Sequence, residues 1–261
     1  MNVARPTFQL NPSSPAIKLP VGACDTHFHI FGPGSRFAYD ASLPVPPADA
    51  PKELLFALHR QLGIDCGVMV QSTVHGYDLG VLEDFLAAGL GRYRGVALVP
   101  LTVTDAELQR LQGLGVRGAR FHFMRHLKAA ASPAEVLRFA QRLLPLGWHL
   151  QMHFESSLIH ELAPVFRASP VPVVIDHMAR VDARLGAEHA DFRATFTELG
   201  HTIRDIAGRR AVWMFLLAYW LYIDGVNTVI KMAVDFGLAL GLPAQSLLGA
   251  LLLTQFVAFP A

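Results

Sequence analysis

Short apolar runs alternate along the chain with segments whose apolar residues recur at helical spacing. An alternating segment at 21–31 and apolar runs at 66–71, 94–101, 116–123, 147–154 and 171–176 predict six strands. The intervening segments 53–62, 79–90, 105–113, 133–144 and 156–168 predict five helices. Strands that are nearly continuous in apolar residues and are joined by helices are typical of a parallel sheet covered by helices on its outer side.

The number of predicted strands falls short of a closed (β/α)8 barrel, an α/β fold that needs eight strand–helix units. The last predicted strand ends near residue 176, and the chain after it shows no further alternation of strand and helix. We therefore expect an incomplete (β/α)8 TIM barrel of about six strands.

A different pattern begins after this part. Residues 212–234 are apolar and long enough to span a bilayer as a helix, and residues 245–259 form a second, shorter apolar segment. A soluble domain of this size needs a polar outer face, and a helix buried in a soluble protein is the less favoured alternative. The sequence thus predicts a barrel over 1–195, then a hairpin of two transmembrane-like helices over 196–261, with membrane contact through 212–259.

Composition excludes several classes of protein. The formal net charge of +1 gives no reason to expect nucleic acid as a partner. The two cysteines, Cys24 and Cys66, make no disulfide framework, which favours a reducing compartment. The first twenty residues contain proline and polar residues where a signal peptide needs an unbroken apolar run. We expect a cytoplasmic barrel and a membrane-embedded tail.

His27 and His29 give the sharpest chemical signal. Residues two apart on a strand point to the same face, so both imidazoles are expected to project together at the carboxyl end of the first strand. Active sites of (β/α)8 barrels are built at that end. Two neutral imidazoles there bind a divalent metal or position a carbonyl and a carboxylate. The alternative is a pair of histidines hydrogen-bonded in the core.

Four other predicted strands also end in polar or ionisable residues. Histidines and an arginine gathered at one end suit a small anionic substrate with a carbonyl to be attacked. In contrast, His59, His160, His189 and His201 fall on predicted helices, and we expect them to be solvated. The strand-end residues are Gln71, Ser72 and Thr73; Arg120 and His122; His153 and Glu155; Asp176 and His177.

Six stretches together resemble the amidohydrolase superfamily, in particular the branch of 2-pyrone-4,6-dicarboxylate lactonase and related sugar-lactone enzymes. The resemblance runs from residue 20 to about 185 and keeps the order and spacing of the strand ends. The stretches are GACDTHFHIFGP (22–33), MVQSTVHGYD (69–78), RGVALV (94–99), GVRGARFHF (115–123), GWHLQMHFE (147–155) and VPVVIDHMAR (171–180).

The resemblance implies a hydrolase that opens a small cyclic ester, or a related carboxylated carbonyl compound, by adding water. It implies that His27 and His29 face the substrate carbonyl or a metal, and that His177 helps to orient the substrate. It further implies that Arg120 and Arg180 hold substrate carboxylates and that Thr73 offers a hydroxyl.

The chain departs from the dicarboxylate lactonase at several positions. A second arginine after the fourth strand falls on His126, beside Arg125, and a tyrosine of the first loop falls at about Val45. A tyrosine on the fifth strand is His153 here, as in metal-binding relatives. The resemblance therefore implies one zinc or manganese ion at His27, His29 and His153, with metal-independent catalysis as the alternative.

The superfamily's general base is an aspartate at the end of the eighth strand, for which the sequence offers no counterpart. We therefore expect hydrolysis to be impaired. The tail from about residue 203 resembles two consecutive spans of a major facilitator transporter. On the first span, Asp224, Asn227 and Lys231 share one helical face, which in a transporter would line the interior. The alternatives to a hydrolase are a transporter fragment and a non-functional fusion of the two.

Overall fold

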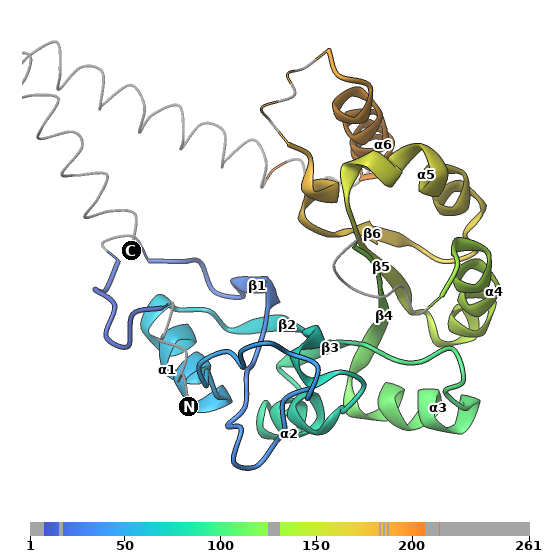
Figure 1. The fold of residues 1–261 in the computed structure, drawn as a ribbon. Helices are drawn as coiled ribbons and strands as arrows, with labels where there is room; N and C mark the ends of the chain where they lie inside the picture. The colour runs from blue at the N-terminus through green and yellow to red at the C-terminus, as the bar shows by residue number, and fades with distance from the viewer. Residues whose placement is uncertain are drawn as a thin grey trace, which may run out of the picture. The chain divides into compact units, whose positions relative to one another are not determined.

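A parallel six-stranded sheet organises the first part of the chain (Figure 1). The computed structural model describes residues 8–15, 18–124, 131–182, 184, 186, 188–206 and 214. The strand order is sequential, and each strand is parallel to its neighbours, so the predicted open part of a barrel is confirmed. The strands are β1 (Cys24–Phe28), β2 (Cys66–Val70), β3 (Tyr93–Ala97), β4 (Val116–Phe123), β5 (His149–Phe154) and β6 (Val173–Ile175).

Five helices connect the strands and lie along the outer side of the curved sheet (Figure 1). Local signals set their ends: Thr104 accepts a hydrogen bond from the Glu107 amide at the start of α3, and Ser132 with Glu135 forms a capping box on α4. The helices are α1 (Lys52–Leu62), α2 (Gly80–Ala88), α3 (Asp105–Leu114), α4 (Pro133–Leu143) and α5 (Ile159–Ala168), and α6 (Ala190–Ile206) follows the last strand.

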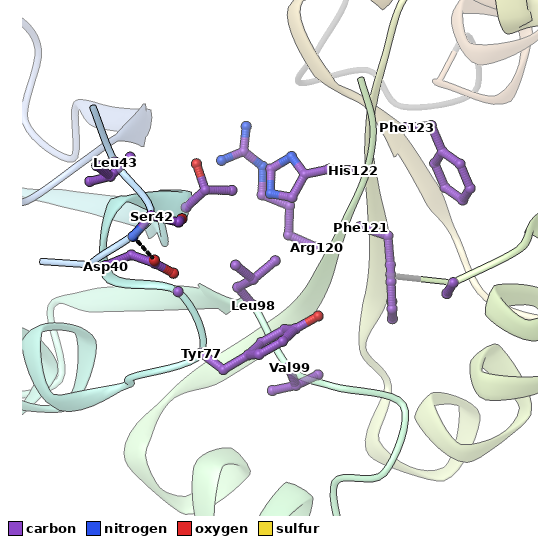
Figure 2. A pocket seen from close by; sticks show the side chains of 13 residues that line it. Asp40, Ser42, Leu43, Tyr77, Leu98, Val99, Arg120, Phe121, His122 and Phe123 are labelled. Atoms are coloured by element: carbon purple, nitrogen blue, oxygen red, sulfur yellow. Dashed lines mark hydrogen bonds between the residues drawn. The ribbon is translucent and has the colours of Figure 1, made fainter. Parts of the chain in front are cut away.

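The core fills the space between the sheet and these helices. Phe85 of α2, Leu111 of α3 and Leu143 of α4 are fully buried, as are Trp148 and Phe154 on or beside β5. Side chains alternate along β4, so that Phe121 and Phe123 join this core while Arg120 and His122 project to the opposite side (Figure 2). The polar side chains are thereby gathered on the concave face of the sheet.

The expectation that His59 is solvated is wrong. Only 2% of its surface is exposed, and its ring packs against Phe28 and Tyr93. The helical spacing explains this, since position 59 lies one turn after Leu55 and Phe56 on the stripe of α1 that faces the sheet. His160, by contrast, is exposed as expected, with 58% of its side-chain surface accessible.

The chain divides into two compact units, one made of residues 1–10 and 15–195 and the other of 11–14 and 196–261. Among the residues that the structure describes, none of the helices combines the length and apolar character that crossing a bilayer requires. The apolar helices expected over 212–234 and 245–259 lie outside the described residues, apart from Met214. The hairpin of transmembrane-like helices therefore stays a prediction.

Candidate active site

A buried carboxylate, Asp176, joins three of the strand ends. It directly follows β6, and only 3% of its surface is exposed. One carboxylate oxygen, Oδ1, lies 3.4 Å from Nδ1 of His27 and 3.6 Å from Nε2 of His177. The other oxygen, Oδ2, accepts a hydrogen bond from Nη2 of Arg120. Asp176 thus connects the ends of β1, β4 and β6 at the carboxyl edge of the sheet.

Arg120 is as deeply buried as its partner. It is 3% exposed, and its Nη1 donates to the carbonyl oxygen of Gln71 at 3.1 Å, which also fastens β4 to the end of β2. Burial raises the pKa of the Asp176 carboxyl, but the Arg120 guanidinium and the two histidines outweigh that effect and hold the pKa below its usual range. The Nε of Arg120 is buried and has no hydrogen-bond partner among the described residues.

Five imidazoles form a continuous row beside this ion pair. Ring centroids lie 5.1 Å apart for His29 and His27, 5.1 Å for His27 and His177, 5.3 Å for His177 and His153, and 5.3 Å for His153 and His122. Burial lowers the pKa of His29 to about 4, of His122 to about 3 and of His153 to about 4. These three imidazoles are therefore neutral near pH 7, the form that accepts protons and binds metals.

A cavity of about 500 Å³ opens on the same side of the sheet, a size suited to a small molecule. Thr73 at the end of β2, Arg120 and His122 line it, and Figure 2 shows Arg120 and His122 together above Tyr77 and Leu98. Residues that follow β1, β2, β3 and β4, with the rest of the β4 end, complete the lining: Asp40, Ser42, Leu43, Gly76, Tyr77, Leu98, Val99, Phe121, Phe123 and Ala131.

The turn after β6 holds an unusual backbone. His177, Met178, Ala179 and Arg180 have φ values of 49°, 50°, 54° and 48°, the left-handed region that non-glycine residues avoid. This turn, η4 (Asp176–Arg180), presents His177 and Arg180, both exposed, directly after the buried Asp176. Backbone strain of this kind is concentrated at functional sites, which agrees with the position of the turn at the strand ends.

The residues expected to form the site are placed in three groups. His27, His29, His153 and His177 join the row of imidazoles, Arg120 and Thr73 line the cavity, and Arg180 lies exposed on η4. The sequence indicates Asp176 and His122 only as strand-end residues and assigns no role to either. The sequence carries a signal for both, since both lie at the ends of predicted strands, Asp176 beside His177 and His122 two positions after Arg120.

Two departures from the lactonase pattern also find their place. His126 and Arg125 lie outside the described residues. Val45, where a tyrosine was expected from the resemblance, is 50% exposed in the loop after β1. A tyrosine nevertheless lines the cavity, because Tyr77 reaches it from the loop after β2 (Figure 2). Burial raises the pKa of Tyr77, so its hydroxyl keeps its proton near pH 7.

Three donors come close enough together to hold one metal ion. Single donor atoms of His27, Asp176 and His177 all lie within 4.8 Å of one another, and among the described residues no other such group of histidine, cysteine or carboxylate donors occurs. The set shares His27 with the expected ligands, while Nδ1 of His29 contacts the Val70 carbonyl oxygen at 2.6 Å and Nδ1 of His153 contacts Nδ1 of His122 at 3.2 Å. Two imidazoles and a carboxylate suit zinc or manganese.

Comparison with known proteins agrees with this geometry. The sequence matches the Amidohydrolase family over residues 24–214. This chain belongs to that family. It is 42% identical over 182 residues, 70% of the chain, to a 2-pyrone-4,6-dicarboxylate hydrolase of Comamonas testosteroni. It is 34% identical over 199 residues, 76% of the chain, to a 4-sulfomuconolactone hydrolase of Rhizobium radiobacter. It covers 60% and 64% of these relatives, so it spans about three-fifths of their length.

A solved structure from Pseudomonas putida, named as a candidate 2-pyrone-4,6-dicarboxylic acid hydrolase, shares the fold. It is 30% identical, with a TM-score of 0.60, and the match covers 69% of this chain and 65% of that one. A further relative is of another kind: the uncharacterized MFS-type transporter YxiO of Bacillus subtilis is 48% identical over 66 residues, 25% of this chain and 15% of the transporter.

Proposed function

We propose that the strand-end site binds a small lactone that carries acidic groups and hydrolyses its ester bond by adding water. The observation that carries the proposal is the cluster around Asp176, which places two imidazoles and a guanidinium beside one buried carboxylate. The names of the two curated relatives support the substrate class, since both name the hydrolysis of an anionic lactone. The size and polarity of the cavity agree with a ligand of that class.

His27 is the residue best placed to handle the proton. Asp176 faces its Nδ1 at 3.4 Å, and its Nε2 is buried without a hydrogen-bond partner among the described residues. A carboxylate at Nδ1 fixes the tautomer of an imidazole and leaves Nε2 able to accept a proton. In hydrolysis, a water loses a proton to this base as its oxygen bonds to the ester carbonyl carbon. The tetrahedral adduct then breaks the ring C–O bond, and the ring oxygen receives a proton.

We propose that cationic and hydroxyl groups at the strand ends bind the acidic groups of the substrate. Arg120 lines the cavity, but its Nη atoms already donate to Asp176 and Gln71. We therefore propose that it attracts the anionic substrate through its positive charge and offers only its buried Nε–H as a donor. Arg180, exposed on η4, and the hydroxyl of Thr73 are the remaining groups proposed to contact substrate. His29 and His177 flank His27 and are proposed to orient the carbonyl.

The same residues could hold a divalent metal ion. His27 and His177 supply imidazole nitrogens, and Oδ1 of Asp176 is directed toward both, while Oδ2 remains with Arg120. A zinc or manganese ion bound there would supply Lewis acidity, polarising a carbonyl or lowering the pKa of a bound water. Depressed pKa values of His27 and Asp176, the first chiefly from burial, keep both groups in the form that a metal needs.

Calorimetric titration with 2-pyrone-4,6-dicarboxylate tests the proposal. The 261-residue chain is expected to bind it at one site, and Thr73→Val, which removes one hydroxyl and keeps the shape of the side chain, is expected to weaken binding by roughly five- to tenfold, the worth of one hydrogen bond. The matched control is Thr104→Val at the start of α3, which is expected to leave affinity unchanged. Equal affinity of the wild type and Thr73→Val, or no binding, would contradict the proposed site.

For residues 196–261 we propose a separate origin in a transporter of the major facilitator type, supported by the short match to the Bacillus protein. The proposal predicts that the whole chain, expressed in bacteria, is recovered in the membrane fraction and is extracted by detergent but not by high salt. A chain ending at residue 195 is expected in the supernatant. Recovery of the whole chain as a monomer without detergent would exclude a membrane-embedded tail.

A further inference from the structure

The strand that carries His27 does not follow a regular two-residue repeat. In the pairing of β1 with β2, Asp25 lies opposite Gly67 and Phe28 lies opposite Met69, so three steps along β1 match two along β2. One extra residue is therefore inserted in β1 between Asp25 and Phe28, which is a β-bulge. A bulge changes the side to which the following side chains point, and bulges occur beside active sites for that reason.

The contacts on both faces of β1 show what the bulge does. Asp25 and Phe28 both contact His59 of α1, so both point to the helix side of the sheet. His27 points to the other side, where it meets Asp176. In a regular strand Asp25 and His27 share a face. The extra residue thus allows an aspartate on the helix side and a histidine in the site to lie only two positions apart.

A chain of polar contacts holds this bulge from the helix side. The amide of His27 donates to Oδ1 of Asp25 at 3.2 Å, and Nε2 of His59 faces Oδ2 of Asp25 at 3.4 Å. Nδ1 of His59 lies 3.1 Å from the Tyr93 hydroxyl. The Nε2 contact with Asp25 is an ion-pair contact without hydrogen-bond geometry, while Nδ1 accepts the hydroxyl proton of Tyr93 when the ring proton is on Nε2. Residues of β3, α1 and β1 therefore fix the backbone of His27.

The strand opposite the bulge leaves room for it. A Cβ atom on Gly67 would lie 2.7 Å from the Asp25 carbonyl oxygen and 2.7 Å from Cε1 of Phe28, closer than such atoms approach. Two members of this set of polar contacts are deeply buried, since His59 and Tyr93 are each 2% exposed. Burying an imidazole costs free energy unless polar partners compensate for the lost water. The partners of His59, Asp25 and Tyr93, therefore indicate its role.

We propose that Asp25 and His59 are positioning residues that hold the β1 bulge and thereby direct His27 toward Asp176. The proposal rests on the proposed function in one respect, the part given to His27 in catalysis. The placement of His27 is a structural statement that can be tested without turnover. Neither Asp25 nor His59 lines the cavity, and the contact that connects them to the site is the hydrogen bond from the His27 amide to Asp25.

Histidine-selective ¹⁵N labelling of the 261-residue chain provides the test, with the signals of His27 assigned from His27→Ala. In Asp25→Ala the His27 amide loses its acceptor, so its proton is expected to move upfield, and Nδ1 of the ring is expected to shift as contact with Asp176 is lost. Asp25→Asn keeps an oxygen in the Oδ1 position, and its His27 signals are expected to stay near those of the wild type. This rescue separates positioning from a general need for charge.

The distant end of the chain of contacts is tested by His59→Phe and His59→Gln. The first fills the space without a polar atom, and the second keeps an N–H donor toward Asp25. Lactone hydrolysis is expected to fall by about 10- to 100-fold in His59→Phe, the usual effect of losing a partner that orients a site histidine, with KM little changed. The matched control is His160→Gln, since His160 forms a 3.4 Å contact with Asp191 on the surface.

Unchanged His27 signals in Asp25→Ala, or equal shifts in Asp25→Ala and Asp25→Asn, would overturn the proposal. Should Asp25→Ala fail to fold, Tyr93→Phe and His59→Phe report on the same His27 signals without altering β1. Unchanged His27 signals in His59→Phe would then overturn the proposal. A wild-type chain that hydrolyses no lactone would contradict the proposed function, while the His27 signals would still decide the positioning role.

Discussion

Replacing everything after about residue 190 with the last strands of a related lactonase is expected to speed lactone hydrolysis by roughly 10²–10⁴-fold over the 261-residue chain, the contribution of a second general base in addition to His27. The family resemblance places that base on an eighth strand, whereas the described residues form only six strands. Within them, β1 and β6 each have a neighbour on one side only. Unpaired strand edges admit water to the core and to the site, which weakens the electrostatic interactions there.

Steady-state rates of the chimera and the original chain, with and without added zinc or manganese, measure this effect. His27→Ala in the chimera is expected to return the rate to the level of the original chain. His160→Ala, on the outer surface of α5, is the matched control and is expected to leave it unchanged. If the unmodified chain hydrolyses lactones as fast as the chimera, then His27 with Asp176 suffices as the base and no residue of an eighth strand is needed.

The periodic pattern of the sequence was sufficient to predict the sheet. Each strand and helix expected up to residue 176 is present, and the sequential parallel order follows from short connections between alternating elements. The boundaries differ most at β1, where 21–31 is expected and the strand is Cys24–Phe28. They differ also at β6, where 171–176 is expected and only Val173–Ile175 pairs. Its register runs from Leu150 to Met152 of β5, so the strand is limited by having one partner.

The partners of the polar side chains could not be predicted in the same way. Periodicity shows that Arg120 and Asp176 occur at strand ends, but their contact joins residues 56 positions apart on β4 and beyond β6. The burial of His59 was missed for a related reason, because its polar partners come from β1 and β3. A strict period of two also gives Asp25 and His27 the same face, and only the inserted residue in β1 separates them.

The Arg120–Asp176 pair is expected to dominate the stability of the site. Both side chains are almost fully buried, at 4% and 2% exposure, so removing one leaves the other charged, desolvated and unpaired. Asp176→Ala is therefore expected to lower the free energy of unfolding by about 3–5 kcal/mol. The exposed pair of Arg193 and Glu188, with 70% and 92% exposure, is the matched control. Glu188→Ala is expected to cost less than about 1 kcal/mol.

A double-mutant cycle separates the pair from the packing of its side chains. Arg120→Met with Asp176→Leu removes both charges and keeps apolar volume, and this variant is expected to be more stable than Asp176→Ala because no isolated charge remains. Urea unfolding of the wild type, Arg120→Met, Asp176→Leu and the double variant, followed by circular dichroism, gives the coupling energy, and Asp176→Ala is measured beside them. Stability and binding are expected to separate in the double variant. Since Asp176 also faces His27, this variant should bind lactone poorly although it is more stable than Asp176→Ala. A double variant less stable than Asp176→Ala would contradict this account. It would show that the unpaired charge of Arg120 is not what destabilises Asp176→Ala.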